Sequence, residues 1–181
     1  PKAELHLHLD GSLRPETMID LATRQGKLAK LPARTAEALA TAVRGIDTAG
    51  SLEAYLAWFD ITLVLMQTRQ ALARIARELV EDAAAENVRD LEVRFCPLLH
   101  VDEGLSLEAV VTAVLDGLHE AGAEHGVETG LIICALRGKL AQESLHLAQL
   151  AVAFKGRGVV AFDLAGPEAG HPAKEHLEAF S

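Results

Sequence analysis

The chain has 181 residues, half of them hydrophobic, with a formal net charge of -9 at pH 7 and a sequence pI near 5.3. This length suits one domain with a substantial core, and the hydrophobic content excludes an intrinsically disordered chain. The acidic charge argues against nucleic acid as a partner, because phosphate binding needs a basic face. No apolar run is long enough to cross a bilayer and no basic-then-apolar leader opens the chain, so we expect a cytoplasmic protein with no membrane partner.

The chain opens on a predicted strand, Ala3–Leu9. A helix is predicted over Arg14–Gln25, with a proline in its first turn and a glycine after its end. Residues 26–50 lack a clear period and predict a loop with one short helix near Thr35–Val43. Helices and strands then alternate. The further predicted helices are Leu52–Gln67, Arg69–Glu86, a helix from the Ser106 cap to about His125, Leu140–Phe154 and Pro172–Phe180, and the further predicted strands are Val88–Phe95, Val127–Leu136 and Val159–Leu164.

Strands that are apolar on both faces and alternate with helices predict a parallel sheet in an α/β fold. Four such units fit either an open doubly wound sheet or half of a parallel (β/α)8 TIM barrel. No glycine-rich phosphate loop follows the first strand, so the open dinucleotide-binding sheet lacks its usual motif. A complete barrel usually needs about 250 residues, and half a barrel leaves two unpaired strand edges. We therefore expect residues 1–181 to be the N-terminal half of a single barrel domain, with about its first four strands, in a longer chain without a second domain.

The first predicted strand carries the candidate chemistry. Because successive side chains of a strand point to opposite faces, His6, His8 and Asp10 share one face. The residues on the other face are Leu5, Leu7 and Leu9. We expect the leucine face to be buried and the imidazoles to point into an enclosed space. Histidines one pleat apart can reach one zinc ion, since zinc lies about 2.0–2.1 Å from a ligating nitrogen, although a His-x-His pair also occurs as two structural histidines near a strand end.

The segment from His6 to Thr17, His-Leu-His-Leu-Asp-Gly-Ser-Leu-Arg-Pro-Glu-Thr, resembles the opening signature of the adenosine deaminases, metal-dependent purine deaminases of the amidohydrolase type. Leu56–Asp60, Leu91–Pro97 and Phe162–Glu168 resemble later segments of the family in the same order. The resemblance spans nearly the whole chain but only the first part of the family's length. It implies a barrel enzyme of purine metabolism, a Zn²⁺ cofactor and a small purine nucleoside as substrate.

By this resemblance His6 and His8 bind the zinc ion, with His8 also near the substrate, and Asp10 hydrogen-bonds the ribose of the nucleoside. The backbone of Gly166 would bond a purine nitrogen. The implied reaction is hydrolytic deamination of adenosine or deoxyadenosine to inosine and ammonia, by attack of a zinc-bound water at C6.

Plainer interpretations stand beside these roles. Asp10 before a glycine is also typical of a turn cap, and Gly166 is also typical of a turn. Leu56 and Phe59 match positions that form an apolar gate over the family's pocket, while apolar residues at this spacing are equally typical of the core face of a helix.

Arg94 lies on the second predicted strand and Arg137 follows the third, and both are expected to pair with carboxylates such as Asp163 or Glu92 rather than to act in catalysis. Cys96 and Cys134 are predicted to be small buried residues, since two thiols make no disulfide framework. The other histidines share no ligand spacing, and most are expected to face solvent. They are His100, His119, His125, His146, His171 and His176.

No catalytic acid or base is assigned within the chain; both are expected beyond Ser181. The family's His-Ala-Gly-Glu segment and Asp-Asp pair, which supply them and the remaining zinc ligands, do not occur here. Two ligands leave a zinc site incomplete, so we predict that residues 1–181 alone are inactive. Three alternatives stay open: an adenine deaminase, another His-x-His metal-dependent hydrolase or phosphoesterase, and a binding or scaffold protein. Within the deaminase family that this chain resembles, Asp at position 10 favours adenosine over free adenine as the substrate, because the adenine deaminases tend to carry Glu there.

Overall fold

The structure is a computed structural model that describes residues 1–46 and 59–181. Its strands are β1 (Lys2–His8), β2 (Val88–Phe95), β3 (Glu128–Leu136) and β4 (Val159–Ala165). Its α-helices are α1 (Pro15–Arg24), α2 (Ala36–Ile46), α4 (Arg69–Ala85), α5 (Leu107–His125) and α6 (Ala141–Ala153), and its 3-10 helices are η1 (Leu28–Lys30), η2 (Pro97–His100) and η3 (Ala173–Phe180). Across these described ranges, no helix combines the length and the apolar character needed to cross a membrane.

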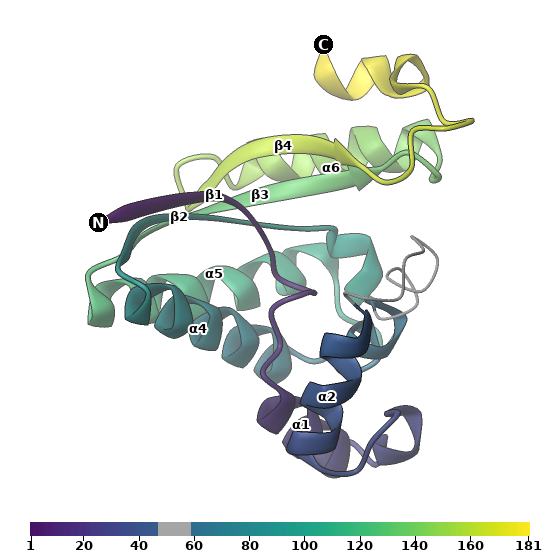
Figure 1. Cartoon of the computed structure of the whole chain (residues 1–181). Coiled ribbons are helices and arrows are strands. Elements are labelled where there is room, and N and C mark those ends of the chain that lie inside the picture. The colour runs from purple at the N-terminus through teal and green to yellow at the C-terminus, as the bar shows by residue number, and fades with distance from the viewer. Residues whose placement is uncertain (47–58) are drawn as a thin grey trace.

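The four strands form one parallel sheet in the order β1-β2-β3-β4, so each strand pairs with its neighbour along the chain (Figure 1). Helix α4 packs against β2 and α5, α5 packs against β3, and α6 packs against β3 and β4. All four strands therefore present their carboxyl ends at the same edge of the sheet. This arrangement confirms the predicted fold class, four parallel strands of an α/β barrel with their helices.

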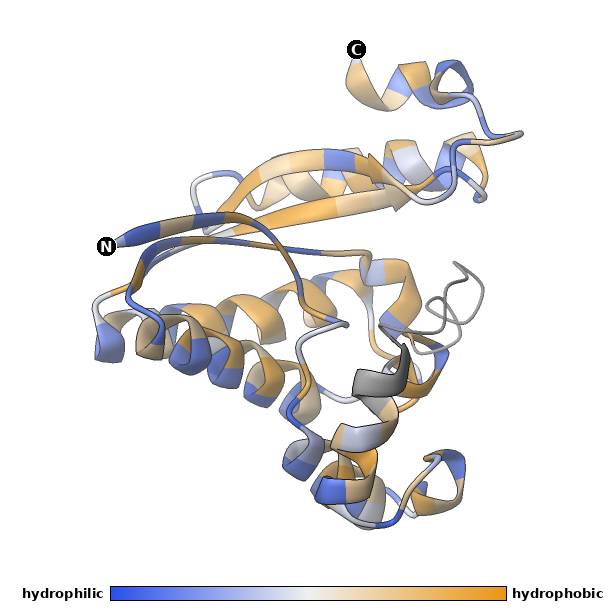
Figure 2. Cartoon of the chain, viewed as in Figure 1, coloured by the Kyte–Doolittle hydropathy of each residue, from blue (hydrophilic) through white to orange (hydrophobic). Residues whose placement is uncertain are grey.

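Much of the core lies between the sheet and helices α4 to α6, and α1 and α2 add Met18, Leu21, Ala22 and Leu39 to it. Strand β3 is buried from residue 130 to residue 135, and Figure 2 shows it as almost uniformly hydrophobic. Helix α5 approaches α4 closely at Gly117, where a Cβ atom would overlap the carbonyl oxygen of Ala73. Both helices begin at side-chain caps, since Thr68 Oγ1 accepts from the Ala71 N–H at 3.2 Å and Ser106 Oγ accepts from the Ala109 N–H at 3.2 Å. These contacts hold the sheet that positions the candidate site.

Strand β1 differs from the prediction in its burial. Leu9 is fully buried, but Leu7 is only half-buried and Leu5 is 53% exposed. The expectation of a buried leucine face is therefore wrong at Leu5. The reason is position: in the described part of the chain β1 pairs with β2 alone, so nothing covers the first half of this edge strand.

Two predicted helices also differ. The start of the predicted Leu52–Gln67 helix lies outside the described residues, and the described part is helical only over residues 59–63. The predicted helix Pro172–Phe180 is a 3-10 helix, η3. The other predicted elements match the observed ones to within three residues at each end, and the short helices η1 and η2 were not predicted.

Candidate active site

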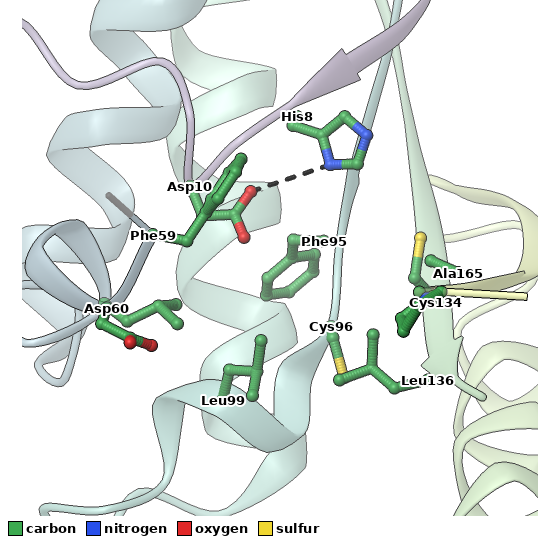
Figure 3. Close-up of a pocket in the computed structure, with 13 residues that line it drawn as sticks. His8, Asp10, Phe59, Asp60, Phe95, Cys96, Leu99, Cys134, Leu136 and Ala165 are labelled. Atoms are coloured by element: carbon green, nitrogen blue, oxygen red, sulfur yellow. Dashed lines mark ion pairs between the residues drawn. The ribbon is translucent and has the colours of Figure 1, made fainter. Parts of the chain in front are cut away.

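A cavity of about 640 Å³ opens at the carboxyl ends of the strands (Figure 3). This volume lies within the roughly 300–1,000 Å³ typical of small-molecule sites, and the carboxyl edge is where barrel enzymes carry their active sites. Each strand end contributes to the wall, as does the helical segment at residues 59–63. The lining residues are His8, Asp10, Phe59, Asp60, Leu63, Phe95, Cys96, Leu99, Cys134, Leu136, Ala165, Gly166 and Pro167.

His6 and His8 lie side by side on β1. Their ring centroids are 5.4 Å apart and the rings are tilted by 51°, so the two imidazoles share one face as the alternation predicts. His8 lines the cavity and its side chain is 43% exposed, whereas His6 is exposed and lies outside the cavity lining. The expectation that both imidazoles point into an enclosed space is therefore wrong for His6, because β1 is an open edge in the described chain.

Arg94 is the buried cation beside this pair. It lies on β2, is 7% exposed, and forms an ion pair with Asp163 on β4, as predicted for it. Its Nη1 also lies 2.9 Å from His6 Nδ1. A guanidinium only donates hydrogen bonds, so His6 Nδ1 is the acceptor and the ring proton lies on Nε2. A metal on Nδ1 would replace the hydrogen bond from Arg94. A metal on Nε2 would move the ring proton to Nδ1, which could then no longer accept from Arg94, so binding at either nitrogen requires Arg94 to move away.

Burial, followed by the positive charge of Arg94 and the neighbouring His6, lowers the pKa of His8. The lowered pKa keeps the imidazole neutral at physiological pH, which is the form that binds a metal.

Asp10 is the buried carboxyl at the mouth of the site. Its Oδ1 lies 3.8 Å from His8 Nδ1 (Figure 3), and within the described residues this oxygen has no hydrogen-bond partner. Burial raises the pKa of Asp10 to about 6, although hydrogen bonds from the backbone N–H groups of Asp10 and Gly11 oppose the shift. Helix α1 has Arg14 at its N-cap position and no side-chain cap, so Asp10 does not cap this helix, whereas the backbone hydrogen bond from Gly11 agrees with the predicted alternative of a turn cap. A buried carboxylate oxygen with a free lone pair is suited to accept a hydrogen bond from a ligand.

The types of donor present suit a zinc ion. Two imidazoles one pleat apart supply nitrogen ligands, and Asp10 Oδ1 lies 3.8 Å from His8 Nδ1. Within residues 1–46 and 59–181, no group of three or more His, Cys, Asp or Glu side chains is arranged to hold a metal.

A family model described as Adenosine deaminase matches residues 1–181. The chain belongs to the adenosine deaminase family. It is 49% identical over 185 residues to an adenosine deaminase of Mycolicibacterium vanbaalenii, an alignment that covers 99% of this chain and 50% of that protein. The chain thus spans about half the length of the curated relatives it matches.

Solved structures agree with this family assignment. The adenine deaminase from Arthrobacter aurescens superposes with a TM-score of 0.84 at 29% sequence identity, over 99% of this chain and 53% of that one. An amidohydrolase from Burkholderia ambifaria with bound Zn superposes with a TM-score of 0.82 at 28% identity, over 99% of this chain and 48% of that one. Both proteins are deaminase or amidohydrolase chains about twice as long as this one.

The remaining predicted residues of this adenosine deaminase family member have three outcomes. Phe59 and Gly166 both line the cavity, and Gly166 has a φ of +100°, a conformation that favours glycine. Leu56 lies outside the described residues. Arg137 pairs with Glu168 at 3.0 Å, so its predicted role as a partner of a carboxylate is confirmed.

Several cavity residues were not predicted. Phe95, Leu99, Leu136 and Pro167 form much of the apolar wall, and each follows or ends a strand, which is the signal that could have identified them. The two cysteines are buried as predicted and also line the cavity. Burial raises the pKa of Cys96 to about 12 and also raises the pKa of Cys134, so both thiols stay protonated and are poor nucleophiles or ligands.

Two histidines expected to face solvent are buried instead. His100 is fully buried, and its Nδ1 lies 3.0 Å from the Met66 carbonyl oxygen. His176 is 1% exposed and lies 2.8 Å from Ser144 Oγ through its Nδ1. Each is buried because a distant segment supplies a hydrogen-bond partner for the ring.

Proposed function

We propose that the longer protein containing this chain is a zinc-dependent hydrolytic deaminase that converts adenosine or deoxyadenosine to inosine and ammonia. Residues 1–181 would form the N-terminal half of its single barrel domain. Family membership supports a hydrolase acting on C–N bonds. The observation that carries the proposal is the cavity itself, which brings His8, Asp10 and Gly166 from two strand ends to one space of suitable size.

In this proposal His6 and His8 hold the zinc ion. When bound, zinc would lower the pKa of a coordinated water to about 7 and so make a hydroxide nucleophile available. The chain contributes to this by keeping His8 neutral, since burial and the nearby Arg94 lower its pKa. The remaining ligands and the catalytic acid and base would come from the part of the protein beyond Ser181.

Substrate binding would fall to the cavity wall. The purine would lie against the apolar side chains of Phe95, Leu99 and Leu136, which exclude water from one side of the pocket. Asp10 would accept a hydrogen bond from the ribose through its unpartnered Oδ1. The backbone of Gly166 would bond a purine nitrogen, because the absence of a side chain lets a ligand approach closely.

The apolar gate over this pocket stays a prediction from the family pattern. Phe59 is placed at the cavity wall, which supports it. Leu56 belongs to the same proposal but lies outside the described residues. A cytoplasmic location and the absence of a nucleic-acid partner also stay predictions, based on composition and charge.

The second candidate is adenine deamination. It is favoured by the adenine deaminase structure, which superposes with a TM-score of 0.84 over 99% of this chain. The carboxyl at position 10 separates the two: a ribose-binding Asp10 predicts a preference for adenosine, whereas a site for free adenine needs no ribose contact. A scaffold role would require that the longer protein bind purines without releasing ammonia.

Ammonia release by the full-length protein tests these alternatives directly. With Zn²⁺ present, we expect adenosine to be deaminated with a higher kcat/KM than adenine. Preference for adenine would replace the first candidate by the second, and binding without turnover of either would favour the scaffold. Residues 1–181 alone, with Zn²⁺ added, are expected to release no ammonia, and clear turnover by this half would contradict the proposed division of the site.

A further inference from the structure

The wall of the cavity next to β4 is an exposed loop. Gly166 and Pro167 line the cavity, and every residue from 166 to 170 is exposed to solvent. Burial therefore contributes little to fixing this loop, and its conformation depends on hydrogen bonds. Figure 1 shows it turning back from the end of β4 toward η3, which packs on α6. We call residues 166–171 the β4 loop.

Arg137 supplies the hydrogen bonds that span this loop. It follows β3, and its side chain is only 15% exposed. Its Nη2 donates to Glu168 Oε1 at 3.0 Å and its Nη1 donates to the His171 carbonyl oxygen at 3.3 Å. One guanidinium thus contacts both the middle and the end of the β4 loop. Its backbone N–H also donates to the Ala165 carbonyl oxygen at 2.9 Å, at the residue just before the loop.

The backbone of Arg137 is in turn fixed by a buried histidine. Its carbonyl oxygen lies 3.2 Å from His176 Nε2, and His176 Nδ1 lies 2.8 Å from Ser144 Oγ on α6. His176 and Ser144 are each 1% exposed, so this connection is buried. Arg137 therefore contacts the β4 loop directly through its side chain, and it contacts η3, which follows the loop, through its carbonyl oxygen. His176 of η3 also connects this region to α6.

We propose that Arg137 is a positioning residue: its guanidinium holds the β4 loop so that Gly166 and Pro167 form a preorganised wall for the purine nucleoside. Arg137 does not itself line the cavity, so it acts only through the loop. The ion pair with Glu168 alone would contribute little, because the Glu168 side chain is 81% exposed. The contact at two points matters because it restricts the loop to one conformation before the ligand binds. The ligand then does not have to order the loop, which would reduce the binding free energy. This inference rests on the proposed function for the nature of its ligand.

The test compares Arg137→Met with the wild type in the full-length protein. Arg137→Met keeps the aliphatic stem and removes both hydrogen bonds. We expect the KM for adenosine to rise about tenfold, equivalent to about 1.4 kcal/mol, with kcat nearly unchanged. Hydrogen–deuterium exchange in the absence of substrate should become faster in the β4 loop. Arg157→Met is the matched control, since Arg157 lies over the Phe154 ring near the amino end of β4 and is not among the residues that line the cavity.

Arg137→Lys gives a second variant should Arg137→Met fail to fold. A lysine ammonium is a single compact donor group and cannot reproduce the guanidinium's fork, so its KM should lie between those of the wild type and Arg137→Met. Unchanged exchange in the loop, or a KM within twofold of the wild type, would overturn the proposal. A fall in kcat at constant KM would also overturn it. If the wild type deaminates no adenosine, the proposed function fails while the exchange measurement still decides the role of Arg137.

Discussion

His100 makes the stability of this protein depend on pH in a way that can be measured. The ring is fully buried, packs 5.4 Å from the Phe95 ring, and bonds the Met66 carbonyl oxygen through Nδ1. Burial lowers the pKa of His100 from 6.5 to about 4. Between these values the unfolded chain binds a proton that the folded chain does not, so the free energy of unfolding falls as the pH falls.

The size of the effect follows from the two pKa values. Their difference corresponds to a contribution of about 3 kcal/mol to the free energy of unfolding. This contribution is complete above about pH 7.5, and most of it should be lost by about pH 4.5. His100→Gln keeps a donor for the Met66 carbonyl oxygen but cannot be protonated. The wild type should therefore lose about 2–3 kcal/mol more than His100→Gln between those two pH values.

Urea unfolding of both proteins at the two pH values provides the assay. His146→Gln is the control, because His146 is exposed on α6 and should follow the wild type. Subtracting the variant from the wild type cancels the other groups that titrate in this range. If the wild type and His100→Gln lose the same free energy within about 0.5 kcal/mol, the reasoning from burial is wrong.

Three further predictions concern the candidate site. Replacing His6 or His8 by Gln should lower the Zn²⁺ affinity of the full-length protein, as measured by competition with a chelator. The loss should exceed the roughly 10–100-fold seen when a residue that hydrogen-bonds to a metal ligand is changed, and unchanged affinity would exclude both histidines as ligands. Asp10→Ala should raise the KM for adenosine but leave that for adenine almost unchanged, because only adenosine has a ribose, and an equal change for both would refute a ribose contact. Gly166→Ala should destabilise the protein by about 1–3 kcal/mol in thermal unfolding, since its φ is +100°. Gly138→Ala, whose Cβ would meet nothing within 4 Å, is the control, and equal melting temperatures for both variants would contradict the strain.

The elements that could be predicted are those with local causes. Strand β2 matches its prediction at both ends, Val88–Phe95, because an alternating and partly β-branched segment is ended by Pro97. Helix α5 begins where Ser106 caps it and ends at Gly126 in the left-handed conformation. In the same way, the alternation of side chains was enough to place His6 and His8 on one face.

The features that could not be predicted depend on distant partners. The exposure of Leu5 depends on whether another strand covers β1, which no local pattern encodes. The burial of His100 and His176 depends on Met66 and Ser144, which are 34 and 32 residues away in the chain. The contact between Arg94 and His6 likewise spans 88 residues, and it depends on the pairing of β2 with β1.

The most direct test of the proposed metal site is anomalous diffraction at the zinc edge from crystals of the full-length protein. We expect one strong peak bonded to a ring nitrogen of His6 and of His8 at about 2.0–2.1 Å, with the Arg94 guanidinium withdrawn from His6 Nδ1. A zinc peak held by other side chains, with the two imidazoles unbound and Arg94 still on His6, would contradict it.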